Sequence, residues 1–287
     1  MKDLKFLPKE IMNLNEKKII SLNKDYIKEF SKVYLNPSKV DKFLRKNSDR
    51  IENDIKTKFK KLQLHKDFAI YANGGFGRKE MFPSSDVDLS LIEINKVKNY
   101  ENLENFISYM WDRGYKVGHS VRSISDIKKI SKKDLKEFTS YLTRRAIISN
   151  ESIDKKITKA LSGLWTRNNF YNHKFIEQQR RHSEFHSSAY NLEPDLKESP
   201  GTLRDFQSAL WILQHCYNLD TFDSINEANV LDGEFNKTLK AYNFIKSLRF
   251  ATNIATEKNR LSFEAQVEIS TYAKLNKKSS KLSVETM

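Results

Sequence analysis

The chain has 287 residues, of which 38% are hydrophobic and 31% are charged. This composition indicates a folded protein of one large domain or two ordinary ones, and it excludes a disordered chain. Apolar stretches stay far below the roughly 18 residues that span a membrane, and residues 1–18 lack the apolar core of a signal peptide. Cys216 is the single cysteine, which excludes an intramolecular disulfide. We expect a cytoplasmic protein with no membrane partner.

The net charge of +14 and the isoelectric point near 9.5 are typical of proteins with polyanionic partners, such as nucleic acid, an acidic membrane face or nucleotide phosphates. The excess consists mostly of lysine and is spread along the whole chain. Because a nucleic-acid footprint requires clustered basic residues, the charge alone does not favour a nucleic-acid partner.

The first half of the chain alternates between helical and strand-like patterns. Residues 1–64 form a lysine-rich extension with helical spacing over 25–34 and 40–64, interrupted around Asn36-Pro37. Strands are predicted over 68–72, 86–92 and 115–121. Helices are predicted over 102–113, 123–130 and 133–148.

From residue 152 onward the pattern is nearly all helical. Helical stretches cover 153–164, 169–185, 203–217, 234–256 and 262–273. The segment 191–201 contains two prolines and is expected to be a loop, and the tail 274–287 is expected to fray. The fold class is α+β: a helical extension (1–64), a domain with a small mixed sheet and helices (65–150) and an all-α domain (151–287).

One short stretch concentrates residues suited to phosphate chemistry. The predicted strand 68–72 runs into Gly74 and Gly75, and glycines let the backbone approach a phosphate closely. Arg78 follows, and its guanidinium could hold phosphate oxygens. Asp86 and Asp88 stand two apart on the next predicted strand, so their side chains point to the same face.

Two neighbouring carboxylates repel each other, which indicates a cation between them. Mg²⁺ prefers oxygen ligands and is usually held by one or two carboxylates together with substrate phosphates. A lone Gly-Gly is usually a turn and a lone Asp-x-Asp is usually a solvated pair. Here Gly75 and Asp86 lie eleven residues apart, each at the boundary of a predicted strand, and this combination favours a nucleotidyl-transfer site.

This arrangement resembles the DNA-polymerase-β-like nucleotidyltransferase superfamily. More closely, the chain resembles the bacterial PII-protein uridylyltransferase/uridylyl-removing enzymes. Four stretches support the closer resemblance: 74–78 with Glu80, Phe82-Pro83 and 85–89; 111–114 with 117–122; Arg181-His182 with 190–197, Pro200-Gly201, 203–205 and Trp211; and 259–261 with Phe263, Gln266, Val284-Glu285 and Met287.

The resemblance implies a polymerase-β-like nucleotidyltransferase domain followed by the helical domain that accompanies it in this family. It implies UTP as the donor, Mg²⁺ or Mn²⁺ as the metal, and a tyrosine of the PII signalling protein as the acceptor. Gly74, Gly75, Arg78 and Ser85 would then bind the nucleotide phosphates. Asp86 and Asp88 would be the catalytic residues and the metal ligands.

The chain departs from the family pattern in several places. Lys79 and Thr202 stand where the family usually has glycine, and the family tends to carry a glutamate near Thr143. The superfamily generally uses a third carboxylate, for which Glu193 and Asp195 are the candidates. The family continues into a phosphohydrolase domain and two ACT domains, which are absent from this sequence, so uridylyl removal and glutamine sensing are not expected.

Three other functions remain open. The same fold could adenylylate glutamine synthetase or another protein, although 191–197 favours the uridylyl branch. The chain could be a remnant that binds PII or nucleotide without turnover. A nucleic-acid end-adding enzyme would show salt-sensitive RNA binding.

Several polar and aromatic residues have competing interpretations. His182 and His186 lie four apart on a predicted helix, but without a third ligand a hydrogen-bonding role is favoured over metal binding. His119 and Arg122 follow the third strand, either touching nucleotide or, for the histidine, buried against backbone.

Two further expectations concern packing. Trp111 and Trp211 lie on apolar helix faces and are expected in the core. Asp195, Lys197, Arg204 and Asp205 are expected to form an ion-pair network that docks the helical domain over the active cleft.

Overall fold

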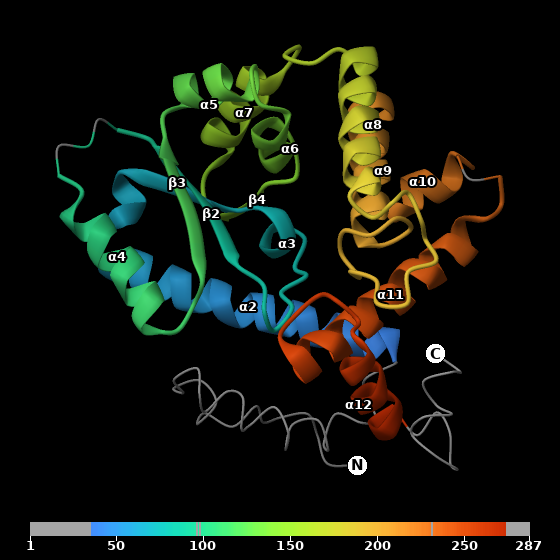
Figure 1. Ribbon diagram of the computed structural model, residues 1–287. Helices are drawn as coiled ribbons and strands as arrows, with labels where there is room; N and C mark the ends of the chain where they lie inside the picture. The colour runs from blue at the N-terminus through green and yellow to red at the C-terminus, as the bar shows by residue number, and fades with distance from the viewer. Residues whose placement is uncertain (1–35, 96, 98, 231, 274–287) are drawn as a thin grey trace. The chain divides into compact units, whose positions relative to one another are not determined.

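The computed structural model describes residues 36–95, 97, 99–230 and 232–273 (Figure 1). The expected helix over 25–34, the tail from residue 274 and the motif at 284–287 lie outside these residues. Within them the chain forms two compact units: one is Phe43–Ser162, and the other combines residues 36–42 with residues from Gly163 onward. No helix in the described part of the chain has the length and apolar character needed to cross a bilayer.

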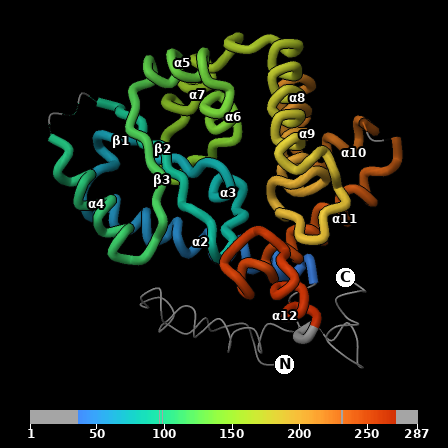
Figure 2. The backbone as a smooth tube through the Cα atoms, viewed as in Figure 1, coloured from blue at the N-terminus to red at the C-terminus, as the bar shows by residue number. Residues whose placement is uncertain are grey.

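A four-stranded mixed sheet is the centre of the first unit, with strand order β3-β2-β1-β4. Figure 2 labels β1, β2 and β3 along the backbone. The strands are β1 Phe68–Ala72, β2 Val87–Glu93, β3 Val117–Arg122 and β4 Arg145–Ile148. β1 pairs antiparallel with both β2 and β4, whereas β2 and β3 run parallel. A parallel pair needs a crossover connection, and α4 Glu101–Asp112 provides it.

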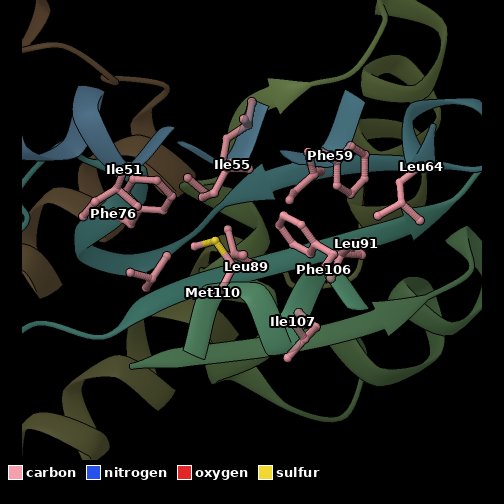
Figure 3. Close-up of a cluster of buried hydrophobic side chains, with 14 of the residues drawn as sticks. Ile51, Ile55, Phe59, Leu64, Phe76, Leu89, Leu91, Phe106, Ile107 and Met110 are labelled. Carbon is pink, nitrogen blue, oxygen red and sulfur yellow. The ribbon is translucent and has the colours of Figure 1, made fainter. Parts of the chain in front are cut away.

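One face of the sheet packs on α2 Pro37–Lys61 and α4. Ile51, Ile55 and Phe59 of α2 meet Phe106 and Met110 of α4 and the inward-facing strand residues in one hydrophobic cluster (Figure 3). The rings of Phe59 and Phe106 pack edge to face with centroids 5.3 Å apart. α2 begins at Pro37, and proline is well suited to the first helical turn because it has no N–H to satisfy.

The opposite face of the sheet is covered by α5 Ile124–Ser131, α6 Leu135–Leu142 and α7 Glu151–Leu161 (Figure 1). Tyr71 of β1 points to this side, where its buried hydroxyl donates to Asp154 Oδ1 of α7 over 2.5 Å. Burial, followed by the hydrogen bond to the Asp154 carboxylate, raises the pKa of Tyr71. The sheet is therefore the middle of three layers.

The sequence prediction of a helix over 133–148 is wrong in its last part, because Arg145–Ile148 forms strand β4. α6 ends at Leu142, and the next residues pair with β1, with Ile148 opposite Ile70 and Ala146 opposite Tyr71. The antiparallel hydrogen bonds to the open edge of β1 decide the structure of this short segment, and helical periodicity cannot reveal them. The other predicted strands and helices of this unit are confirmed to within a few residues.

The second unit is helical, as expected. Its helices are α8 Arg167–Ser183, α9 Leu203–Tyr217, α10 Phe222–Glu227, α11 Phe235–Thr256 and α12 Phe263–Ala273. The sequence did not predict α10. The loop expected over 191–201 is confirmed, and it is tied to the segment after α11 by an isolated bridge between Asp195 and Arg260. Together with the mixed sheet, this confirms the α+β class; the expected domain boundaries stay a prediction.

The two tryptophans differ from each other. Trp211 on α9 is 9% exposed, which confirms its place in the core, and the Lys174 ammonium lies 4.4 Å from its ring centroid. The same expectation for Trp111 is wrong, since its side chain is 56% exposed. Trp111 lies at the end of α4, after the face that supplies Leu103, Phe106 and Met110 to the core.

The expected ion-pair network is confirmed only in part: within the helical unit Lys197 and Arg204 pair with Glu198, and Asp205 pairs with Arg181. Arg204 donates to both oxygens of Glu198 over 3.2 and 2.9 Å. Asp205 accepts from Arg181 over 2.5 Å and from the Gly201 N–H over 2.7 Å. These hydrogen bonds connect α8, α9 and the loop between them, so the ion pairs join parts of one unit; their role in docking stays a prediction.

The carboxylate of Asp205 is expected to stabilise the helical unit in a pH-dependent way. Burial alone would raise its pKa, but hydrogen bonds from Arg181, Gly201, His182 and Gln178 outweigh burial and lower it. A depressed folded-state pKa gives stability that is present above the unfolded value of about 3.9 and is lost as pH falls through the folded pKa. Asp205→Asn should lower the free energy of unfolding by about 1–3 kcal/mol at pH 7.

Urea unfolding of wild type and Asp205→Asn at several pH values tests this. The difference in the free energy of unfolding between the two proteins should shrink below about pH 4. Asp220→Asn, an exposed position in the same unit, is the control and should be neutral. A difference that stays constant down to pH 2 would contradict a role for the carboxylate charge.

Candidate active site

The glycine turn after β1 is a single turn of helix, α3 Gly74–Gly77. Gly74 has φ +54°, a left-handed conformation that glycine adopts without steric cost. The Gly77 N–H donates to Asn73 O over 2.8 Å, and the Glu80 N–H donates to Gly75 O over 2.8 Å. These bonds fold the turn back on itself beside the end of β1.

Asp88 lies directly against this turn. A Cβ atom added to Gly74 would lie 2.8 Å from Asp88 Oδ2, and one added to Gly118 of β3 would lie 3.0 Å from Asp88 Oδ1. Gly118 is the partner of Asp88 in the parallel register of β2 and β3. The carboxylate therefore occupies a space between two backbone segments that lack side chains.

Asp86 immediately precedes β2, two residues before Asp88. Both aspartates are exposed and the intervening Val87 is 1% exposed. Alternation along an extended chain puts the two carboxylates on one side and Val87 in the core on the other. The structure thus places Asp88 at the glycine turn and Asp86 two residues before it on the same side, and the role of the pair stays a prediction.

A polar layer that the sequence analysis missed lies behind Asp88. The Asn73 N–H donates to Asp88 O over 3.0 Å, and its side-chain amide donates to Ser90 Oγ. Ser90 Oγ lies 3.5 Å from Ser120 Oγ on β3. Asn73 is 5% exposed, so these bonds fix the turn to the strand that supplies Asp88. Residue spacing alone could not show which polar side chains meet across the strands.

The other predicted phosphate-binding residues are Arg78 and Ser85. Arg78 Nε donates to Glu80 Oε2 over 2.9 Å, and the arginine side chain is 23% exposed. Ser85 is half-buried and its N–H donates to Phe82 O over 3.1 Å. Each of these residues lies on the segment that joins α3 to β2, and their contact with a nucleotide stays a prediction.

The candidates for a third metal ligand have other partners. Glu193 accepts from Arg260 and from the Phe263 N–H, each over 2.8 Å. Asp195 Oδ1 accepts the N–H groups of Lys197 and Glu198, each over 2.8 Å. Both carboxylates thus stabilise the loop of the helical unit.

The remaining candidates are His119 and Arg122 on β3 and His182 on α8. His119 is exposed, so the expectation of a buried histidine is wrong. It follows Gly118 on the strand, so its side chain points to the opposite face from Asp88. Arg122 donates to both oxygens of Glu137 over 2.5 and 3.0 Å. His182 lies 2.9 Å from both Asp205 oxygens, which supports its hydrogen-bonding role.

The donor set of the acidic pair fits a hard divalent cation. Two carboxylates on one face supply oxygen ligands, and the missing side chains at Gly74 and Gly118 leave room for the Asp88 carboxylate. In the described part of the chain no group of three His, Cys, Asp or Glu residues is placed to hold a metal. Phosphate oxygens of a bound nucleotide would complete such a coordination sphere.

Comparison with known proteins agrees with the motifs. Residues 169–287 match the family model described as GlnD PII-uridylyltransferase. The chain is 34% identical over 211 residues to a bifunctional uridylyltransferase/uridylyl-removing enzyme of Haemophilus influenzae, covering 70% of this chain and 24% of that protein. Proteins of the same name from Pasteurella multocida and Nitrosococcus oceani are 32% and 33% identical, over 70% of this chain and 24% and 23% of theirs. The chain thus spans about a quarter of the length of these relatives, and the predicted resemblance is confirmed.

Gly74→Ala is expected to displace the Asp88 carboxylate. The new methyl group would lie 2.8 Å from Asp88 Oδ2. Alanine would also have to adopt the left-handed φ of +54° that glycine has there. Backbone strain should cost about 1–2 kcal/mol of stability, and Mn²⁺ affinity measured by paramagnetic resonance with UTP present should fall at least about tenfold because a ligand is displaced.

Gly114→Ala is the matched control, because Gly114 has φ +78° but nothing within 4 Å of an added Cβ. It should lose similar stability and keep Mn²⁺ affinity. Equal affinities in the two variants would contradict the placement of Asp88 as a ligand.

Lys79 has a left-handed backbone conformation that favours glycine. Lys79 has φ +59°, and its Nζ lies 2.8 Å from Asp49 Oδ1 at the surface. Lys79→Gly should relieve the strain, whereas Lys79→Val adds a branched side chain that fits this region poorly. Because both variants lose the same ion pair, urea unfolding should show Lys79→Gly more stable than Lys79→Val by about 1–2 kcal/mol. Equal stability would mean that the turn relaxes.

Proposed function

We propose that this chain, which is similar to PII-uridylyltransferases over the part described above, transfers UMP from UTP to a tyrosine hydroxyl of a PII signalling protein. The observation that supports this most directly is the Asp88 carboxylate between Gly74 and Gly118, with Asp86 on the same side. This geometry suits a bound triphosphate: its oxygens and the two carboxylates would together coordinate Mg²⁺.

In the proposed reaction the tyrosine oxygen forms a bond to the α-phosphorus of UTP, and its hydroxyl proton leaves to solvent. The bond from that phosphorus to the bridging oxygen breaks, and pyrophosphate leaves. Bound Mg²⁺ would neutralise charge on the phosphates and orient the departing group. Asp86 and Asp88 would hold the cation, while Gly74 and Gly75 would let the phosphates approach the backbone.

The surrounding residues keep this arrangement rigid. Asn73 ties the turn to β2, and Ser90 continues the tie towards β3 through Ser120. Arg78 is available to the phosphates from the end of the turn, with Glu80 orienting its guanidinium. Such fixed groups act on charge that develops in the transition state without having to reorganise.

Intact-mass analysis of a PII protein incubated with this chain, UTP and Mg²⁺ tests the proposal. We expect a gain of one UMP per PII subunit, and none when EDTA removes the cation. A parallel reaction with ATP distinguishes an adenylyltransferase. No transfer from either nucleotide by the wild-type chain would overturn the proposal.

Asp86→Asn and Asp88→Asn should each lower the rate of transfer at least about a thousandfold, because each removes a charged metal ligand while keeping side-chain volume. Asp112→Asn, at an exposed position of the same unit, is the control and should keep the wild-type rate. Thermal unfolding of all three should change little, since both site aspartates are exposed. Retained transfer in Asp88→Asn would contradict its role.

A further inference from the structure

Arg145 is placed at the glycine turn by the strand that the sequence analysis did not predict. It is the first residue of β4, and its register partner on β1 is Ala72. Ala72 is the last residue of β1, immediately before Asn73 and the turn. Antiparallel pairing therefore brings a guanidinium from a distant part of the sequence to the point where the turn begins.

The Arg145 guanidinium binds the carbonyl end of the turn. Its Nε donates to Gly77 O over 3.0 Å and its Nη2 donates to Phe76 O over 3.2 Å. The guanidinium carbon also lies 5.6 Å from the centroid of the Phe76 ring. The last carbonyls of a helical turn have no partner within the helix, and a cation there is favourable. Arg145 thus stabilises α3 from its C-terminal end.

A carboxylate on α2 holds Arg145 from the other side. Arg145 Nη1 donates to Glu52 Oε2 over 2.5 Å, and Lys56 lies 2.6 Å from Glu52 Oε1. Glu52 is 8% exposed; burial alone would raise its pKa, but the hydrogen bonds from Lys56 and Arg145 outweigh burial and lower it. Glu52 follows Ile51, which is part of the hydrophobic core. The contact therefore connects the turn to a helix that cannot move independently of the sheet.

The turn is packed closely against its neighbours at both ends, so a shift at one end reaches the other. A Cβ added to Gly77 would lie 2.9 Å from Ala72 O and 3.0 Å from Thr143 O, so the backbone of the turn touches β1 and the segment before β4. On its other side, Gly74 touches the Asp88 carboxylate. A shift at Gly77 would be transmitted over three residues to the position that faces Asp88.

We propose that Arg145 is a positioning residue for nucleotide binding: anchored by Glu52, it holds the glycine turn at the separation from Asp88 that a metal-bound triphosphate requires. This inference rests on the proposed function. Arg145 acts through the carbonyls of Phe76 and Gly77 and is not itself a catalytic residue.

Two variants of Arg145 test the proposal in the full chain. Arg145→Gln removes the positive charge and the planar set of guanidinium N–H donors. Arg145→Lys keeps the charge and the pair with Glu52 but cannot bond two carbonyls and a carboxylate in one plane. The dissociation constant of a non-hydrolysable UTP analogue with Mn²⁺, measured by calorimetry, should rise at least about tenfold in Arg145→Gln and by a smaller factor in Arg145→Lys.

Arg144→Gln is the matched control. Arg144 is the neighbouring residue, and it donates to Tyr141 O and Thr158 Oγ1, each over 2.8 Å. Its substitution should lower the thermal midpoint as much as Arg145→Gln does, and it should leave the dissociation constant unchanged. Equal weakening by Arg144→Gln and Arg145→Gln would mean a general loss of packing and would overturn the proposal.

Amide hydrogen exchange without nucleotide separates this inference from the proposed function. Exchange over residues 73–80 should become at least about tenfold faster in Arg145→Gln and stay at the wild-type rate in Arg144→Gln. Unchanged exchange over the turn would overturn the positioning role even if UTP binds. Faster exchange together with no nucleotide binding by the wild-type chain would instead overturn the proposed function, and the nucleotide role of Arg145 with it.

Discussion

The site depends on the close approach of one carboxylate to two backbone segments. Asp88 lies where side chains at Gly74 and Gly118 would collide with its oxygens. Glycine is needed at Gly74 for a second reason, since the backbone there is left-handed. Steric exclusion, more than any single hydrogen bond, therefore fixes where an acidic oxygen, a cation and a phosphate could meet.

The rest of the sheet unit supports this approach from several directions. The parallel pairing of β2 and β3 places Gly118 beside Asp88, and the crossover helix α4 makes that pairing possible. Asn73 links the turn to β2, and Arg145 links it to β4 and α2. Because these bonds start from elements packed in the core, they fix the turn relative to the sheet.

The sequence predicted the local features of this site and missed its long-range ones. The strand before Gly74, the spacing to Asp86 and the period of two through Asp88 are local patterns, so the glycine turn and the acidic pair were found. Strand β4 is short and follows directly on a helix, and only its partner β1 makes it extended. Arg145 was missed for that reason, although it contacts the turn.

Exposure was harder to predict than secondary structure. Trp111 and Trp211 both lie on helices with apolar faces, yet only Trp211 is buried. Glu193 and Asp195 carry the right chemistry for metal binding, but neighbouring N–H groups and Arg260 occupy their oxygens. The sequence shows the chemistry of a side chain, whereas its hydrogen-bond partners depend on which distant segments the fold brings next to it.

The helical unit is discontinuous along the chain. Its first described segment is the start of α2, and Lys246 of α11 donates to Asp41 of that segment over 2.9 Å. Lys246 is 5% exposed, so the carboxylate that balances its charge comes from more than 200 positions away. Along the chain, residues 43–162 of the sheet unit therefore separate two segments of the helical unit. Removing everything before residue 163 would not release an intact helical module, since it would also remove the acidic partner of a buried ammonium.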